Sequence, residues 1–258
     1  MNPSEIVKSI ITNDFDSICV EYFEEIDSTN TYLSDIKFTH DYHLCFAKTQ
    51  TAGRGRRESK WVSSNYSNIY ASFGFKCDWS VDKIPFISIA VGIAILEAIQ
   101  LDVPESEQNN IKIKLPNDIY YKNQKLSGVL IETKNIKHNS FDIIIGFGVN
   151  VNMTETDDKI DRQWSSVSLI ANKNIDLEQL LSNIVINIKN VMKKKLSEII
   201  ETFTKYNYVL NKKITFNDGD TIYNGVAKGV DINRQLKLNV GDTCIYVDIA
   251  KINKLRII

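Results

Sequence analysis

Three arginines and two glycines stand together in residues 53–57, and this segment is the clearest chemical signal in the sequence. Glycine lets the backbone approach a ligand closely and exposes its N–H donors. Arginine binds carboxylates and phosphates through paired hydrogen bonds. The segment therefore predicts a loop that binds an anion, and a solvated basic loop or an RNA contact is the alternative. The segment and its nearest polar and aromatic neighbours are Gln50, Gly53, Arg54, Gly55, Arg56, Arg57 and Trp61.

Two further segments place a lysine beside polar or small residues. Residues 114–118 read KLPND, which sets a cation, an amide and a carboxylate around a proline-fixed turn. A plain surface turn is the alternative there. Residues 125–132 read KLSGVLIE, where Lys125 opens an otherwise apolar strand. Gly128 inside that strand indicates that something approaches the backbone closely, whereas a lysine that protects a strand edge is the alternative for Lys125.

Two weaker segments lie next to predicted strands. Residues 27–30 read DSTN, and a helix N-cap or turn is the favoured interpretation when this segment is taken alone. Residues 146–150 read GFGVN, which is also compatible with a strand bulge. No helix pattern with a third glycine follows, so this segment is not a dinucleotide-binding fingerprint.

Strands and helices without regular βαβ spacing surround these segments, which favours the α+β class. Aromatic and β-branched residues predict strands over 17–26, 43–49, 68–76, 111–114, 118–121, 125–133 and 141–151, with a polar loop at 134–140. Apolar spacing predicts helices over 84–101, 177–192 and 196–203. Short alternating segments with close turns follow residue 210 and predict a small β-barrel or sandwich. We therefore predict two domains, 1–210 and 211–258.

The overall composition excludes several classes of function. The 258 residues include 31 Lys and Arg against 32 Asp and Glu, so the net charge is −1 and any anion site must be local. We therefore expect neither DNA nor a membrane as a partner. The four cysteines form no CxxC pair and show no metal-ligand spacing with histidine, which favours a reducing cytoplasm over a disulfide framework or a zinc site. We expect no signal peptide, because acidic residues occur early in the sequence, and a buried helix with no membrane span over 84–101, because polar residues interrupt that apolar stretch.

In this order and spacing, the five segments resemble the biotin–protein ligase family. The resemblance is carried by DSTN at 27–30, QTAGRGRR at 50–57 followed by KW at 60–61, KLPNDIY at 114–120, KLSGVLIE at 125–132 and GFGVNVN at 146–152. It covers roughly residues 20–155 well and extends weakly to the C-terminus. It implies a mixed β-sheet with packed helices, the class II aminoacyl-tRNA-synthetase-like or biotin–lipoate ligase fold, followed by an SH3-like β-barrel.

The resemblance also implies a two-step reaction. ATP adenylates the biotin carboxylate to biotinyl-5′-AMP, and a lysine of the biotin carboxyl carrier protein, an acetyl-CoA carboxylase subunit, then displaces AMP. Because a carboxylate must approach a phosphate, clustered cations and Mg²⁺ suit this chemistry. A homodimer is left open.

The resemblance assigns roles to individual residues. Those implied to bind biotin or biotinyl-AMP are Ser28, Thr29, Asn30, Gln50, Gly53, Arg54, Gly55, Arg56, Lys125 and Gly128. Those implied to bind the nucleotide are Arg57, Trp61, Asn117, Asn150 and Trp164. Lys125, Arg56 and Asp118 are the implied catalytic residues, and Asp118 is also the implied metal ligand.

The chain departs from the family pattern at three places. Leu115 stands where the family usually has tryptophan, and Ser59 replaces a basic residue found in some members. The first predicted strand begins near residue 17, which leaves no room for a winged helix, so we expect a monofunctional ligase without repressor activity.

Three alternatives differ in class. Lipoate–protein ligases share the fold and the adenylation, but GRGRR together with KLPND argues against them. The neutral net charge argues against a nucleic-acid-binding module. Lys125 retained together with the arginines argues against a non-catalytic interaction protein.

Overall fold

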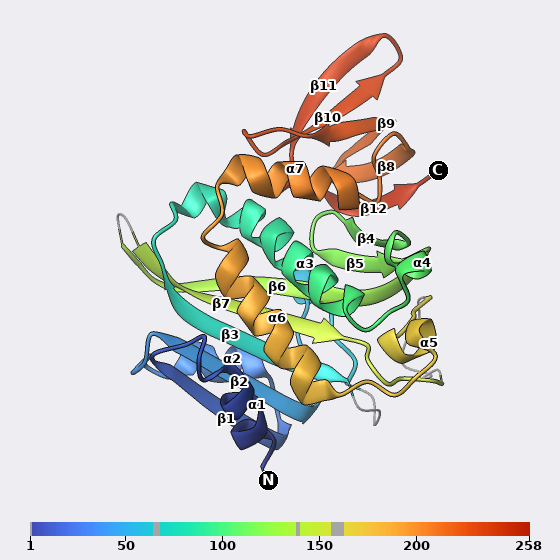
Figure 1. The fold of residues 1–258 in the computed structure, drawn as a ribbon. Helices are drawn as coiled ribbons and strands as arrows, with labels where there is room; N and C mark the ends of the chain where they lie inside the picture. Colours follow the sequence, from blue (N-terminus) through green and yellow to red (C-terminus); the bar gives the residue numbers. More distant parts are fainter. Residues whose placement is uncertain (1, 64–67, 138–139, 156–162) are drawn as a thin grey trace.

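The computed structural model describes residues 2–63, 68–137, 140–155 and 163–258, and its main element is a seven-stranded mixed sheet (Figure 1). The strand order is β1-β2-β3-β7-β6-β5-β4, in which β1 and β2 are parallel and the other neighbours are antiparallel. The strands are β1 (Ile18–Ile26), β2 (Tyr42–Gln50), β3 (Ile69–Cys77), β4 (Ile111–Lys114), β5 (Asp118–Tyr121), β6 (Gln124–Lys137) and β7 (Ser140–Val149).

Helices flank this sheet. The α-helices are α1 (Pro3–Ile11), α2 (Thr29–Asp35), α3 (Ile84–Gln100), α4 (Glu105–Gln108), α5 (Val167–Ala171), α6 (Leu177–Val191) and α7 (Leu196–Tyr206). Two short 3₁₀ helices are η1 (Arg56–Glu58) and η2 (Val81–Lys83). Figure 1 shows α3 and α6 side by side across one face of the sheet, and α2 lies behind it.

A second, antiparallel sheet of five strands follows α7, in the order β11-β10-β9-β8-β12. Its strands are β8 (Lys213–Asp218), β9 (Thr221–Val230), β10 (Gln235–Val240), β11 (Thr243–Asp248) and β12 (Asn253–Ile257). The small β unit predicted after residue 210 is therefore present. Its SH3-like topology and the boundary between 1–210 and 211–258 stay predictions.

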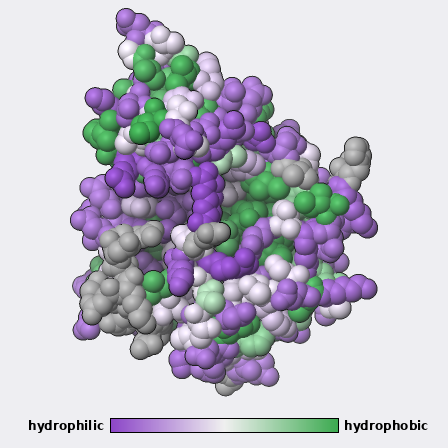
Figure 2. All heavy atoms as spheres, turned by 180° about the vertical axis from the view of Figure 1, so that it is seen from behind, coloured by the Kyte–Doolittle hydropathy of each residue, from purple (hydrophilic) through white to green (hydrophobic). Residues whose placement is uncertain are grey.

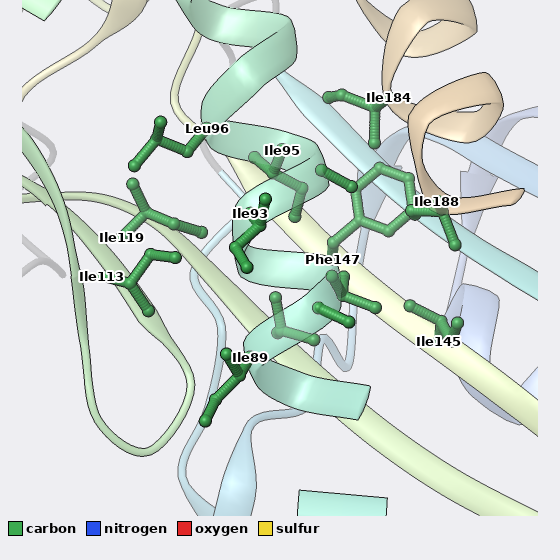
Figure 3. Close-up of a cluster of buried hydrophobic side chains, with 14 of the residues drawn as sticks. Ile89, Ile93, Ile95, Leu96, Ile113, Ile119, Ile145, Phe147, Ile184 and Ile188 are labelled. Carbon is green, nitrogen blue, oxygen red and sulfur yellow. The ribbon is translucent and has the colours of Figure 1, made fainter. Parts of the chain in front are cut away.

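The core lies between the large sheet and helix α3. This helix is apolar on all sides, as expected for a helix enclosed on every side, and it buries residues from Phe86 to Ile99. Figure 3 shows Ile93 and Ile95 of α3 near Phe147 of β7, with Ile145 of β7 and Ile184 and Ile188 of α6 together on one side of the helix. Because side chains alternate along a strand, Gly146 and Gly148 of β7 face away from this core. The bulky residues hold the sheet to its helices, and the glycines leave its other face open.

The predicted α+β class is confirmed, and the predicted strands and long helices agree with the structure to within a few residues. The polar loop predicted at 134–140 is wrong at its described positions, because β6 continues to Lys137 and β7 begins at Ser140; residues 138–139 lie outside the described part of the chain. This hairpin extends beyond the core, so its residues are polar although they are in strands. Lys134, for example, donates to the carbonyls of Leu33 and Ser34 at the end of α2. In the described part of the chain, no helix is long and apolar enough to span a membrane.

Candidate active site

The predicted site residues meet in one cavity of about 1110 Å³ on the open face of the large sheet. Fifteen of the sixteen predicted residues line it: Ser28, Thr29, Asn30, Gln50, Arg54, Gly55, Arg56, Arg57, Trp61, Asn117, Asp118, Lys125, Gly128, Asn150 and Trp164. Gly53 lies beneath, where a Cβ atom would be 2.6 Å from the backbone oxygen of Trp61. Figure 2 shows this side of the molecule, with an apolar recess bordered by hydrophilic residues below the C-terminal sheet.

One end of the cavity is a neutral cradle of buried polar groups. Ser28 caps α2 by accepting a hydrogen bond from the N–H of Thr31, so the predicted N-cap and the predicted site are the same residue. Thr29 donates its N–H to Oε1 of Gln50 at 2.9 Å, and its hydroxyl lies 2.7 Å from that of Ser72. Ser28, Thr29 and Ser72 are each at most 3% exposed. Such an end suits a compact, uncharged ligand group with several hydrogen-bonding atoms.

Glycines form the floor of the cavity. Gly128 of β6 and Gly148 of β7 are direct cross-strand partners, and the indole of Trp61 lies over both. A Cβ at Gly128 would be 2.8 Å from the Trp61 ring, and one at Gly148 would be 2.7 Å from Nε1 of Trp61. Gly146 leaves room for Asn30 in the same way, since a Cβ there would be 2.7 Å from Cγ of Asn30. A side chain at any of these positions would displace part of the site.

The middle of the cavity holds an ion pair between Lys125 and Asp118. Nζ of Lys125 is 2.7 Å from Oδ1 of Asp118 and 5.2 Å from the Trp61 ring centroid. A register shift between β5 and β6 lies at this point. The backbone of Lys125 turns to pair with residues 163–165, where it bonds Gln163 and Ser165 at 3.0 Å each. This pairing brings Trp164 into the site.

Two asparagines hold the segments around this ion pair together. Asn117 donates Nδ2 to the carbonyl of Val129 at 2.6 Å, and its own carbonyl accepts from the N–H of Val129. Asn150 donates Nδ2 to the carbonyls of Lys125 and Ser165 at 3.3 and 3.1 Å. Both side chains therefore position neighbouring backbone in this structure, besides lining the cavity.

The arginine loop covers the cavity from one side. It closes on itself through the N–H of Gly55 and the carbonyl of Ser59, at 2.7 Å. Arg54 forms an ion pair with Glu132 at 2.6 Å. Arg56 and Arg57 donate to the backbone carbonyls of Ala250 and Lys251, each at 3.4 Å. The loop is thus attached to β6 at one end and to the C-terminal sheet at the other.

Positive charge is concentrated here although the whole chain carries −1. The described lining residues include eight basic side chains and one acidic one, Asp118; the basic ones are Arg54, Arg56, Arg57, Lys60, Lys114, Lys125, Lys254 and Arg256. Burial lowers the pKa of Arg56, the charge of Arg57 lowers it further, and Asp118 opposes both. Because charge that is partly withdrawn from water is stabilised by an opposite charge, this part of the cavity favours an anion.

Outside the cavity, three described residues on β1 and β2 bring potential metal-ligating atoms within 4.8 Å of one another: Cys19, Glu21 and His43. Nε2 of His43 accepts the N–H groups of Thr39 and His40 at 3.0 and 3.1 Å. A neutral imidazole with an accepting Nε2 carries its proton on Nδ1. That nitrogen then has no lone pair for a metal, so we assign no metal to this group.

The fold and the cavity together define a class of enzyme. The structure is similar to a biotin protein ligase from Aquifex aeolicus in complex with biotin and ATP, with a TM-score of 0.78, 22% sequence identity, and coverage of 94% of this chain and 100% of that one. This comparison establishes the fold. The pattern of the biotin/lipoate A/B protein ligase family matches residues 22–150, half of the chain, and the chain belongs to this family.

Two curated relatives extend the similarity beyond that segment. The bifunctional ligase/repressor BirA of Escherichia coli is 26% identical over 226 residues, which cover 86% of this chain and 69% of that protein. A biotin–[acetyl-CoA-carboxylase] ligase of Mycobacterium tuberculosis is 23% identical over 220 residues, covering 83% of this chain and 79% of that protein. The resemblance inferred from the five segments is confirmed at the level of the family.

Sequence reasoning missed several residues of the site. Gly146, Gly148 and Glu132 lay inside the quoted segments, but nothing in the sequence distinguished them as contacts of Asn30, Trp61 and Arg54. Ser72 sits in a strand of ordinary composition, and no sequence signal marks it. Lys254 and Arg256 line the cavity from β12, more than a hundred residues from the other segments, so only the fold brings them there.

Proposed function

We propose that this protein activates biotin with ATP to form biotinyl-5′-AMP, and then transfers the biotinyl group to a lysine of a biotin carboxyl carrier protein. The observation that carries the proposal is the pairing of a neutral polar cradle with a cationic region in one cavity. A biotin ureido ring suits the first, whereas its carboxylate and the phosphates of ATP suit the second.

We assign roles to the residues on the basis of their positions in the cavity. Ser28, Thr29 and Gln50 hold the ureido ring. Gly128, over which the Trp61 indole lies, leaves room for biotin beside Lys125. The ammonium group of Lys125 is paired with the carboxylate of Asp118. When substrate is bound, it contacts the reacting carboxylate and phosphate and stabilises their negative charge. Nearly all the catalysis is charge stabilisation and positioning. Trp61 and Trp164 supply aromatic surfaces for the nucleotide.

Arg56 and Arg57 cover the acyl-adenylate. Their hydrogen bonds to the carbonyls of Ala250 and Lys251 are long, at 3.4 Å each. The phosphate of the acyl-adenylate can therefore replace these carbonyls as the acceptor for both guanidinium groups. Once the loop closes on the anhydride it excludes water, which keeps the intermediate intact until the acceptor lysine arrives.

Mg²⁺ is part of the proposal. Among the described lining residues, Asp118 is the single carboxylate. Its Oδ1 atom forms an ion pair with Nζ of Lys125. Mg²⁺ is commonly held by one or two carboxylates together with substrate phosphates. The residues fit an ion that Asp118 and the triphosphate share, and that ion would neutralise phosphate charge in the first step.

Three further expectations remain part of this proposal: a cytoplasmic location, no binding to DNA, and a carrier domain as the protein partner. Homodimer formation is left open.

Pyrophosphate release tests the first step. Purified protein with MgATP should release pyrophosphate when biotin is added, and much more slowly with lipoate or octanoate. A Thr29→Val variant, which keeps the side-chain shape and removes the hydroxyl, should raise the KM for biotin with little change for ATP. Turnover supported by lipoate or octanoate but not by biotin would contradict the proposal.

A further inference from the structure

A chain of hydrogen bonds links the polar cradle to a carboxylate outside the cavity. The Thr29 hydroxyl lies 2.7 Å from the Ser72 hydroxyl, and Ser72 donates to Oδ1 of Asn30. Nδ2 of Asn30 donates to Oε2 of Glu132 at 2.7 Å. Thr29, Ser72 and Asn30 are 3%, 0% and 4% exposed. Buried polar groups are in the large majority of cases hydrogen-bonded, so the proton positions along this chain depend on one another.

Glu132 determines which way these hydrogen bonds run. Its carboxylate is paired with the guanidinium of Arg54 at 2.6 Å, and a carboxylate only accepts. The nitrogen of the Asn30 amide must therefore face Glu132, which leaves its oxygen facing Ser72. The single hydroxyl proton of Ser72 then goes to Asn30.

Thr29 must consequently supply the proton for its contact with Ser72. The other acceptor near this hydroxyl is Oε1 of Gln50, which is more distant at 3.2 Å and already accepts the N–H of Thr29. With its proton directed at Ser72, the Thr29 oxygen presents only lone pairs to the cavity. It accepts hydrogen bonds from a ligand and donates none.

We propose that Glu132 fixes the direction of this chain, so that the buried end of the cavity accepts a hydrogen bond from the ring N–H of a cyclic urea. Glu132 is thereby a positioning residue that determines specificity without touching the substrate. The inference rests on the proposed function, in which the ureido ring of biotin occupies this end. The ion pair with Arg54 also ties the arginine loop to this chain of hydrogen bonds.

The test compares biotin with two cyclic carbamates, each of which has one ring N–H of biotin replaced by oxygen. Binding is measured by titration calorimetry without ATP. In the wild-type protein, the weaker carbamate should bind on the order of 100-fold less tightly than biotin, since its ring oxygen meets the lone pairs of Thr29.

Glu132→Gln is the decisive variant. A glutamine amide can donate as well as accept, so Asn30 can turn over and the whole chain can reverse, which lets Thr29 donate to the ring oxygen. The preference for biotin over the weaker carbamate should shrink at least tenfold, with biotin itself binding less tightly. Glu24→Gln is the matched control, because Glu24 forms an exposed ion pair with Lys48 at 3.0 Å on the same sheet, and it should leave the preference unchanged.

Ser72→Ala provides an independent second variant. It removes the acceptor of the Thr29 proton, so it should also reduce the preference for biotin over the weaker carbamate. If Glu132→Gln does not fold, Ser72→Ala alone tests the inference. The inference is overturned if the folded variants keep the full preference, or if they weaken both ligands by the same factor. If the wild-type protein binds no biotin at all, the proposed function itself fails, and that outcome is distinct from the others.

Discussion

Substituting Gly146 by alanine tests whether the geometry of the cradle determines both stability and binding. The new Cβ would lie 2.7 Å from Cγ and 3.0 Å from Nδ2 of Asn30, too close for the carboxamide to stay in place. Asn30 would lose its hydrogen bonds to Ser72 and Glu132, which are buried or half-buried. Each buried polar group left unsatisfied costs about 1–3 kcal/mol.

The two lost bonds together predict a destabilisation of roughly 2–5 kcal/mol, after the small entropic gain of replacing glycine. Calorimetric unfolding should show a Tm lower by about 5–15 °C. Binding of biotin, measured by titration calorimetry, should weaken by about tenfold or more, because Ser72 loses the Asn30 acceptor that fixes the direction of its hydrogen bond with Thr29.

Gly92→Ala is the matched control for this substitution. Gly92 lies inside α3, and a Cβ there would be an ordinary 3.4 Å from Ile113. This variant should be more stable by about 0.5–1 kcal/mol, since alanine favours the helix, and it should bind biotin as the wild type does. If the Tm of Gly146→Ala and its affinity for biotin both equal those of the wild type, Asn30 has no role in the cradle and the argument is wrong.

Three further outcomes follow from the same contacts. Arg56→Gly should keep pyrophosphate release but let the adenylate escape, so biotin should appear on unrelated proteins; an intermediate retained as tightly as in the wild type would contradict the covering role of the loop. Lys125→Ala should slow adenylate formation by about 10²–10³-fold, seen as pyrophosphate release in single turnovers. Burial, with a smaller contribution from the charge of His40, lowers the pKa of His43. The unfolded chain therefore binds a proton that the folded protein does not, so this stability is present above about pH 6.5 and is lost as the pH falls from there. Between about pH 7.5 and pH 5.5, the Tm of His43→Gln should fall less than that of the wild type. An equal fall would show that His43 does not cause the loss of stability at low pH.

The parts of the fold that the sequence predicted are those in which local pattern and packing agree. Helix α3 is apolar along most of its length, and the second half of β7 alternates large apolar residues with glycine, so both were evident from composition and spacing. The β6–β7 hairpin was misjudged because its end leaves the core, and exposure makes its residues polar whether they form a loop or a strand.

The parts of the site that could not be predicted depend on contacts between distant segments. Glu132 matters because Asn30 and Arg54 both reach it, and neither contact leaves a mark in the spacing of the sequence. Ser72 is an unremarkable strand residue until β3 is paired with β7 beside Gly146. The five motifs thus supplied most of the residues that line the cavity, and the fold shows which residues contact them from behind.

Transfer of biotin to a carrier lysine is the most direct test of the whole account. The purified protein is incubated with biotin, MgATP and a biotin carboxyl carrier domain, and the intact mass of the carrier is measured. A matched carrier with its acceptor lysine replaced by arginine serves as the control. We predict that the carrier gains the mass of one biotinyl group, only when ATP is present and only when the acceptor lysine is present. A carrier that stays unmodified while the protein binds both biotin and ATP would contradict the account.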